Sequence, residues 1–191
     1  MTFRMHALGF MCAAALAGAV TEIQAASWTM SPEASTVSFA GTQTGSEFTG
    51  QFRRFETAIV LDPADLSAAT IEVVVDIASF ASGSPDRDSD SQNRSWFHVA
   101  AFPQARFTSS EVVEAEDGSY VALGTLEIKG VAREIELPFT LTIDGDSAVA
   151  DGTLSLDRLD YNVGDMDEDV EEELVGHGVT VTFHIEATRT G

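Results

Sequence analysis

The sequence predicts an all-β domain of about eight antiparallel strands, arranged as a barrel or a sandwich. Three observations lead to this prediction: several long segments alternate apolar and polar residues, compact turn signals separate them, and no internal repeat or linker divides the chain. From Val131 to Ile143 the odd positions are mostly apolar and the even positions mostly polar. Such a period of two gives a strand one face toward the core and one face toward water.

The other expected strands show the same alternation. It recurs at 70–80, where Ile71 and Val73 share a face, and at 179–186, where Val181 and Phe183 do. In chain order the expected strands span residues 36–44, 48–61, 70–80, 105–113, 120–129, 131–143, 148–156 and 179–186.

Short turn sequences lie between these strands. Lys129–Gly130 joins two strands tightly, since glycine adopts positive φ without steric cost. The sequences EDG at 116–118 and DGD at 144–146 are typical of hairpin turns. Pro138 lies inside an expected strand and cannot donate to a ladder, so an edge or a bulge is expected there.

Two features shape the expected domain further. Residues 82–99 are polar and then aromatic, which predicts a loop with a short helix that starts near Pro85. The strand at 131–143 would be ~43 Å long at ~3.3 Å per residue, whereas ordinary strands have about 5–6 residues. A small barrel holds packed side chains or one small ligand, so a long, narrow barrel would suit a chain-like ligand.

The N-terminus has the layout of a secretory signal peptide. Arg4 precedes an apolar run of 13 residues, from Leu8 to Val20, and the small residues Ala25 and Ala26 follow. The run is too short to span a bilayer, which takes about 20 residues. We therefore expect a signal peptide at 1–25 and one exported domain at 26–191; a retained N-terminal anchor is the alternative.

Composition excludes several classes of function. The chain has 10 basic and 31 acidic residues, a net charge of −21, and loses one of each with residues 1–25. This charge repels phosphate backbones and anionic lipid headgroups, so nucleic acid is not expected as a partner. The single cysteine, Cys12, lies in the expected signal peptide, which excludes disulfides and thiolate sites from the domain.

Several blocks of the chain resemble the YceI-like family of periplasmic polyisoprenoid-binding proteins. They include DRDSDSQNRSWFHVAAFPQARFTSSEV, GTLEIKGVAREIELPFTL and LDRLDYNVG, in matching order and spacing from Trp28 to about Ala187. The resemblance implies a lipocalin-like, extended antiparallel eight-stranded β-barrel in the periplasm. It also implies a binder or carrier, not an enzyme, whose bore holds an isoprenoid or another long-chain lipid, such as a quinone tail, without a cofactor.

The resemblance also assigns particular residues. Arg87 matches the family's R-D pair, Trp96 and Phe97 its aromatic pair, and Arg158 and Tyr161 its R-x-D-[FY] block. Where many members carry two histidines, this chain has Ser35 and Gln43 or Thr44, so a role for those histidines does not carry over. The sequence of two blocks resembles a subgroup of the family that occurs beside b-type cytochrome membrane domains, which suggests such a cytochrome as a partner. A homodimer is left open.

The expected ligand-binding residues are apolar strand positions together with the residues that the resemblance assigns. Either arginine would hold a headgroup or, in the simpler interpretation, pair with Asp88 or Asp160, and the aromatic residues would otherwise only pack a core. The set is Phe39, Phe52, Phe55, Ile71, Val73, Val75, Ile77, Arg87, Trp96, Phe97, Phe102, Phe107, Tyr120, Leu126, Ile135, Leu137, Phe139, Arg158, Tyr161, Val181 and Phe183.

Two other functions were weighed against lipid binding. A hydrolase or isomerase for a small apolar substrate needs a nucleophile beside a base, and no such motif is recognisable. A calcium-dependent interaction module would use the alternating carboxylates at 86–90 or in the acidic segment 165–174. Both segments lack the glycine and the last glutamate of a calcium loop, and the histidines lack metal-site spacing. No metal site and no catalytic residue is therefore expected.

Overall fold

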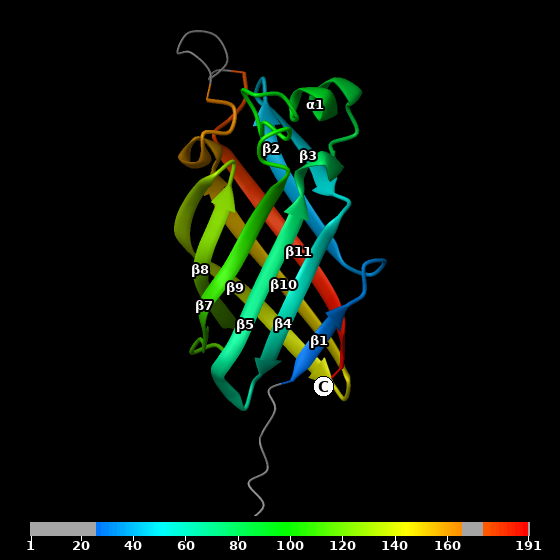
Figure 1. Ribbon diagram of the computed structural model, residues 1–191, viewed down its shortest axis with the longest axis vertical. Helices are drawn as coiled ribbons and strands as arrows, with labels where there is room; N and C mark the ends of the chain where they lie inside the picture. The colour runs from blue at the N-terminus through cyan, green and yellow to red at the C-terminus, as the bar shows by residue number, and fades with distance from the viewer. Residues whose placement is uncertain (1–25, 166–173, 191) are drawn as a thin grey trace, which may run out of the picture.

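A computed structural model describes residues 26–165 and 174–190 as one β-barrel, longer than it is wide (Figure 1). The expected signal peptide and most of the acidic segment 165–174 lie outside the described residues. The strands are β1 (Ser27–Met30), β2 (Thr36–Gln43), β3 (Ser46–Phe52), β4 (Phe55–Asp62), β5 (Asp65–Asp76), β6 (Phe80–Ala81), β7 (Gln104–Glu114), β8 (Tyr120–Ile128), β9 (Val131–Asp144), β10 (Ser147–Asp157) and β11 (Gly178–Arg189); the helices are η1 (Ile77–Ser79), α1 (Pro85–Asp90) and η2 (Arg158–Tyr161).

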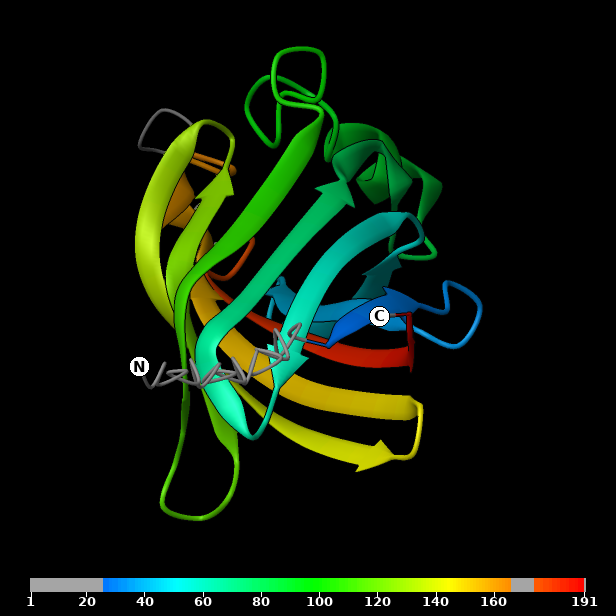
Figure 2. The same cartoon turned by 60° about the horizontal axis from the view of Figure 1, so that its bottom comes forward.

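The barrel closes through eight strand positions. The order β1-β4-β5-β7-β8-β9-β10-β11 returns to its start because β11 also pairs with β1. The short strands β2, β3 and β6 extend this ring above β1, β4 and β5, with β2 pairing to β11 beyond β1. Figure 2 shows the strands curving around a common axis. The expected eight-stranded antiparallel barrel is confirmed.

One expected strand is broken. The sequence predicts a continuous strand at 48–61, but β3 ends at Phe52 and β4 begins at Phe55. Phe52 and Ile59 both line the interior, and one regular strand would send an even and an odd position to opposite faces. The break resolves this conflict, and its backbone remains paired: Arg53 N donates to Ser79 O at 3.2 Å and Asp76 N to Arg54 O at 3.0 Å.

A second break, between β5 and β6, also changes which residues face the interior. Helix η1 separates β5 from β6, and the Asp76 side chain caps it by accepting from Ala78 N at 2.9 Å. Val75 before the helix and Phe80 after it both line the interior. Short non-strand segments thus keep apolar residues inside where the sequence loses its period of two.

The pairing between β9 and β10 stops halfway up the barrel. It runs from Asp144, opposite Ser147, to Phe139, opposite Gly152. Above this point β9 pairs only with β8, and β10 only with β11. Pro138 is the next residue of β9 and has no N–H to continue the ladder. The expected edge at Pro138 is confirmed on the side that faces β10.

Two basic side chains, one from β9 and one from the turn before it, connect this end of β9 to the segments beyond the gap. Arg133 pairs with the Asp160 carboxylate at 3.0 Å, and its Nε donates to the Asp160 carbonyl at 2.7 Å. Lys129 Nζ donates to the Ser95 carbonyl at 3.0 Å. The upper end of β9 is therefore held by side chains where a backbone ladder is missing.

The expected turns and insertion are confirmed. Lys129 and Gly130 both have positive φ, 50° and 75°, as a two-residue hairpin turn requires. Helix α1 begins at Pro85, with Ser84 as its N-cap. No helix among residues 26–165 and 174–190 is long and apolar enough to cross a membrane.

Buried side chains pack together at the end of the barrel that carries β1, and several of them also line the lower part of the cavity. They include Trp28, Leu61, Tyr120, Ala122 and Phe139, all at most 9% exposed. The indole Nε1 of Trp28 donates to the Leu61 carbonyl at 2.9 Å, so the polar atom of this buried ring is satisfied. The barrel is therefore closed at this end, and its cavity opens toward α1 and η2.

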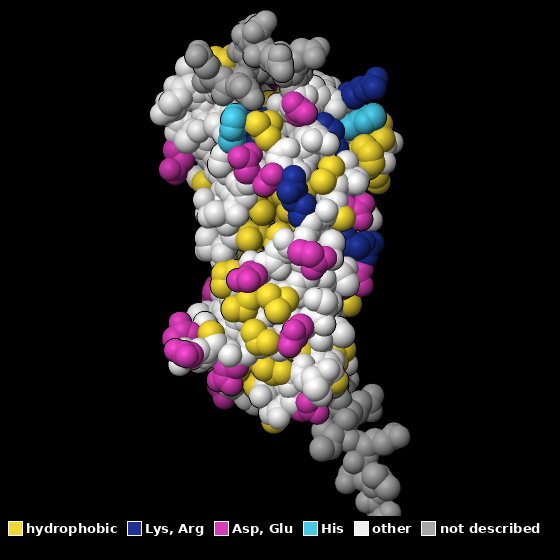
Figure 3. All heavy atoms as spheres, turned by 90° about the vertical axis from the view of Figure 1, so that its left-hand side faces the viewer, with side chains coloured by type: hydrophobic (Ala, Val, Ile, Leu, Met, Phe, Trp, Pro, Cys, Tyr) yellow, Lys and Arg dark blue, Asp and Glu magenta, His cyan; other side chains and the backbone are white. Residues whose placement is uncertain are grey.

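The acidic excess is visible on the outside of the barrel. Figure 3 faces the side that lies left in Figure 1, and Asp and Glu side chains surround a strip of hydrophobic ones there. On this face the negative charge is spread along the length of the barrel.

Candidate functional site

An apolar cavity of about 750 Å³ occupies the bore of the barrel. Eighteen of the expected ligand-binding residues line it. They are Phe39, Phe52, Ile71, Val73, Val75, Ile77, Arg87, Trp96, Phe97, Phe107, Leu126, Ile135, Leu137, Phe139, Arg158, Tyr161, Val181 and Phe183.

Three expected residues do not line the cavity. Tyr120 stacks on Phe139 at 5.6 Å within the packed end of the barrel. Phe102 lies outside the bore, against Gly130, where an added Cβ would be 2.7 Å from its ring. Phe55 starts β4 directly after the strand break and is only half-buried. All three were expected to bind the ligand, but their positions at strand ends or in loops place them away from the bore.

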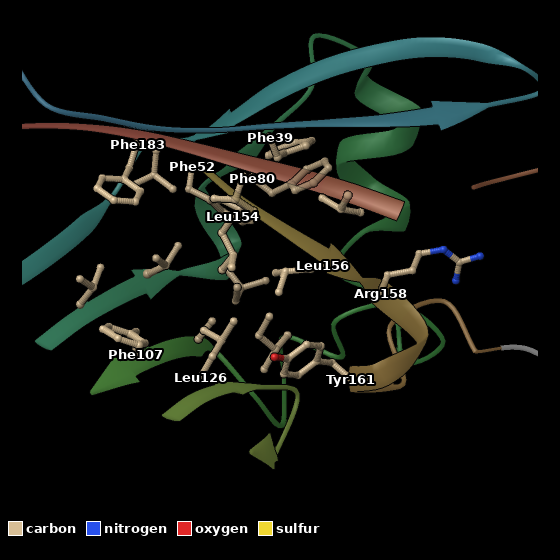
Figure 4. Close-up of a pocket in the computed structure, with 18 of the residues that line it drawn as sticks. Phe39, Phe52, Phe80, Phe107, Leu126, Leu154, Leu156, Arg158, Tyr161 and Phe183 are labelled. Atoms are coloured by element: carbon tan, nitrogen blue, oxygen red, sulfur yellow. The ribbon is translucent and has the colours of Figure 1, made fainter. Parts of the chain in front are cut away.

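Several lining residues were missed by the sequence reasoning. Phe80 directly follows η1, where the alternation is lost, and Phe48 lies within β3 on the same face as Phe52. Leu154 and Leu156 belong to the expected strand 148–156, whose even positions begin with small residues and so gave a weak apolar signal. Figure 4 shows both leucines directed from β10 into the bore, opposite Phe107 and Leu126.

An aromatic cluster forms the wall of the cavity beside β2 and β3. Phe39 stacks on Phe80 with ring centroids 4.6 Å apart, and Phe52 contacts both rings. Phe97, from the insertion, packs against Phe80 at 6.1 Å and so covers the cluster from above. Gly50 opposes Phe39 across the strand pair, and an added Cβ would lie 2.3 Å from the ring. The glycine thus provides the space that the aromatic wall occupies.

Arg158 uses its guanidinium group to organise the mouth of the cavity. The side chain is 6% exposed, and Figure 4 shows it directed away from the apolar side chains of the bore. Its nitrogens donate at 2.8–3.1 Å to the carbonyls of Val163, Gly164, Val175 and Gly176. Its charge also lies 5.4 Å from the centre of the Trp96 ring. Asp160, one of the expected partners, pairs instead with Arg133.

Arg87 lies over the Phe48 ring at 4.2 Å, at the other side of the mouth. Its Nε and Nη1 atoms are enclosed and have no hydrogen-bond partner. Asp88, the expected partner, accepts hydrogen bonds from Ser82 N at 2.7 Å and Ser82 Oγ at 2.6 Å. These bonds from Ser82 lower the pKa of Asp88. The aromatic face, not a carboxylate, is therefore the main contact of the Arg87 guanidinium group.

Tyr161 belongs to η2 and is 2% exposed. Figure 4 shows its ring beside Leu126, with the hydroxyl oxygen directed into the cavity. Burial raises the pKa of the Tyr161 phenol. The lining thus combines many apolar side chains with one phenol near the mouth.

The described part of the chain contains no group of three or more His, Cys, Asp or Glu residues that could hold a metal ion. In the first candidate calcium segment, Asp88 is engaged by Ser82. The second candidate segment falls almost wholly outside the described residues. His184 lies on the outer face of β11 with Asp151 at 2.7 Å and Glu186 at 3.4 Å, away from the bore.

Comparison with known protein families finds a match to the YceI-like domain over residues 28–187. Among curated relatives, a UPF0312 protein of Yersinia pestis (strain Pestoides F) is 31% identical over 144 residues. That match covers 69% of this chain and 73% of the relative.

Solved structures with the same fold include BcnA of Burkholderia cenocepacia. It is 30% identical, with a TM-score of 0.78, over 83% of this chain and 99% of BcnA. A Campylobacter jejuni YceI protein matches with a TM-score of 0.66 at 21% identity, over 76% of this chain and 87% of that protein. A polyisoprenoid-binding domain from Saccharophagus degradans, implicated in plant cell wall breakdown, matches with a TM-score of 0.66 at 17% identity, over 85% of this chain and 98% of that domain. The last two matches show the fold alone.

Proposed function

We propose that this chain, which belongs to the YceI-like family, binds a polyisoprenoid or a related long-chain lipid, such as a quinone tail, in its barrel. The observation that carries the proposal is the apolar cavity of about 750 Å³, closed at one end and open at the other. Its volume lies in the ordinary range for small-molecule sites. The structural likeness to a domain described as polyisoprenoid-binding is consistent with this ligand class.

Burial of the hydrocarbon alone supplies enough free energy for tight binding. Each buried methylene contributes about 0.8 kcal/mol, so a five-carbon isoprene unit contributes roughly 3–4 kcal/mol. A few units exceed the about 12 kcal/mol of nanomolar affinity, even after several kcal/mol are lost in ordering the ligand. No catalytic group or metal ion is required for this function.

The proposed biological role is that of a carrier. Residues 1–25 would direct export, and the domain would then hold its lipid in the periplasm, shielded from water. The eighteen lining residues named above are the proposed ligand contacts. Arg158 would act through the shape of the mouth, because its nitrogens are already bound to backbone carbonyls. A membrane b-type cytochrome and a second copy of the chain are candidate partners on the family resemblance alone.

No observation on the described residues favours either alternative function. The cavity lining contains the carboxylates of Asp86 and Asp90, but no histidine, lysine or cysteine beside a hydroxyl nucleophile in the described part of the chain. The lining also holds serine hydroxyls, but no hydrogen bond among the described residues joins one of them to either carboxylate, which supports a binding function over a hydrolase or isomerase.

The test is the identity of the molecule that copurifies. The full chain is expressed with its leader in a Gram-negative host, purified from the periplasm, extracted with organic solvent and analysed by mass spectrometry. We expect a reproducible prenyl lipid or quinone that is missing from a parallel purification of an unrelated periplasmic protein. Protein that is repeatedly empty and takes up neither prenyl lipids nor quinones would overturn the proposal.

A further inference from the structure

The chain has two tyrosines, and the barrel places them in different surroundings. Tyr161 lines the cavity near its mouth and is 2% exposed. Tyr120 is also buried, at 9% exposed, but it stacks on Phe139 behind the cavity wall and is not part of the lining. The two phenols are therefore a matched pair, one inside the bore and one outside it.

The Tyr161 hydroxyl has no hydrogen-bond partner among the described residues. The guanidinium carbon of Arg133 lies 5.9 Å from the ring centroid, over the ring face. The nitrogens of Arg133 donate to the carboxylate and the carbonyl of Asp160. Both polar neighbours of Tyr161 are thus bound to each other, which leaves the phenol oxygen to the cavity (Figure 4).

An unpaired hydroxyl among apolar side chains calls for a partner. The enclosed side-chain atoms without a partner among the described residues are Thr57 Oγ1 and Arg87 Nε and Nη1; the Tyr161 oxygen is instead reached from the cavity, so a bound molecule can supply its partner. A phenol donates one hydrogen bond and also accepts. The surrounding side chains, which include Leu126 and Leu156, offer no acceptor.

We propose that Tyr161 determines the specificity of the cavity by donating a hydrogen bond to an uncharged oxygen on the head of the ligand, such as the ring carbonyl of a prenylated quinone. The inference rests on the proposed function, because the tail of the same ligand occupies the apolar bore. The head then lies at the mouth beside η2, and the tail extends toward Phe107 and the closed end.

The choice of an uncharged head follows from the charges around the phenol. Burial keeps the phenol protonated, so it acts as a neutral donor. Arg133 is neutralised by Asp160, and the nitrogens of Arg158 are bound to carbonyls. Arg87 lies over the Phe48 ring at the other side of the mouth. An anionic head would bring further negative charge to a chain with a net charge of −21.

The test compares Tyr161→Phe with Tyr120→Phe and with the unchanged protein. Three ligands of equal tail length are used: a prenylated benzoquinone, the polyprenyl hydrocarbon and a polyprenyl phosphate. Tyr161→Phe removes only the hydroxyl, so we expect about 3- to 10-fold weaker quinone binding, as for the loss of one hydrogen bond, and unchanged hydrocarbon binding. Tyr120→Phe should leave the binding of all three ligands unchanged.

A second measurement reports on the hydroxyl itself. In the Tyr120→Phe protein Tyr161 is the only tyrosine, so its titration can be followed by ultraviolet absorbance. A hydrogen bond donated to the quinone should raise the pKa of this phenol above its value in the hydrocarbon complex. A purely structural tyrosine would show the same pKa with both ligands.

The outcomes separate this inference from the proposed function. If the unchanged protein binds quinone and hydrocarbon but Tyr161→Phe weakens neither, the role of Tyr161 is wrong and lipid binding stands. Stronger binding of the polyprenyl phosphate than of the quinone would also overturn the inference. It would indicate that the head of the ligand contacts Arg87 and not Tyr161. If none of the three ligands binds, the proposed function fails and this inference fails with it.

Discussion

The ring of Phe183 covers Gly152, its cross-strand neighbour, so closely that an added methyl group would lie 2.3 Å from Phe183 Cζ. Gly152→Ala should therefore displace the ring or the carbonyl of Pro138, which would be 2.5 Å away. Overpacking of this kind costs about 1–3 kcal/mol, and we expect a lower melting temperature. The control is Gly178→Ala, since no atom lies within 4 Å of the added methyl group there. Equal melting of the two variants would contradict the close contact.

Filling the bore should abolish lipid uptake. Leu154 points into the cavity from β10, and its neighbour Ser155 is exposed on the outer face. Leu154→Trp is expected to reduce uptake of a fluorescent prenyl lipid strongly, whereas Ser155→Trp should leave it unchanged. Circular dichroism checks that both variants retain the barrel. Unchanged uptake by folded Leu154→Trp protein would show that the ligand binds elsewhere.

Loss of the Arg158 guanidinium group should loosen the mouth. Arg158→Met leaves the carbonyls of four residues without their donor, and hydrogen bonds to charged groups contribute about 1.5–3 kcal/mol each. We expect a lower free energy of unfolding in urea, by about 3 kcal/mol or more. The exposed Arg94 provides the control, because Arg94→Met removes the same charge from the surface. Equal stability of the two variants would contradict a structural role for Arg158.

Hydrogen exchange should show where the ladder between β9 and β10 ends. Residues 140–143 of β9 pair with β10, but residues 134–137 pair only with β8. The amides of 134–137 that face β10 should exchange faster than the corresponding amides of 140–143, because they lack a ladder partner. Residue-resolved exchange by NMR measures this difference. Uniform protection along β9 would mean that the two strands pair over their whole length in solution.

His184 should make stability depend weakly on pH. Its hydrogen bond to Asp151, and next the one to Glu186, raise its pKa above the ordinary value of 6.5. The charged pair therefore stabilises the fold fully below about pH 6.5, and this contribution is lost as the pH rises through the raised pKa. His184→Gln should lower the melting temperature near pH 5 but not near pH 9. The site is partly exposed, so we expect less than about 1 kcal/mol. A pH-independent difference would contradict this assignment.

The strands β8, β9 and β11 could be predicted closely from the sequence. Their alternation is unbroken, so the parity of Leu126, Ile135 and Phe183 places each of them in the bore. The turn at Lys129–Gly130 was predictable because few residues adopt positive φ readily. In these strands local pattern and tertiary packing agree, which is why the sequence suffices.

The remaining site residues were harder to predict, since they depend on where strands break. Phe52 and Ile59 cannot share a face on one regular strand, and only the closed barrel shows that Arg53 and Arg54 change the parity between them. The alternation correctly places Tyr120 on the inner face of its strand, but the residue lies at the packed end of the barrel. No local sequence pattern indicates the position of a residue along the barrel axis. Distance along the axis is a property of the whole fold.

Trp28 and Leu61 line the cavity at the end that carries β1, and the hydrogen bond from the Trp28 indole to the Leu61 carbonyl fixes this end as the floor. The distance from the mouth to this floor therefore limits the length of the tail that fits inside the bore. Tails shorter than the bore would leave its lower part unfilled, and longer ones would hold the head above Tyr161. The barrel is thus suited to select its ligand by the number of isoprene units as well as by the chemistry of the head.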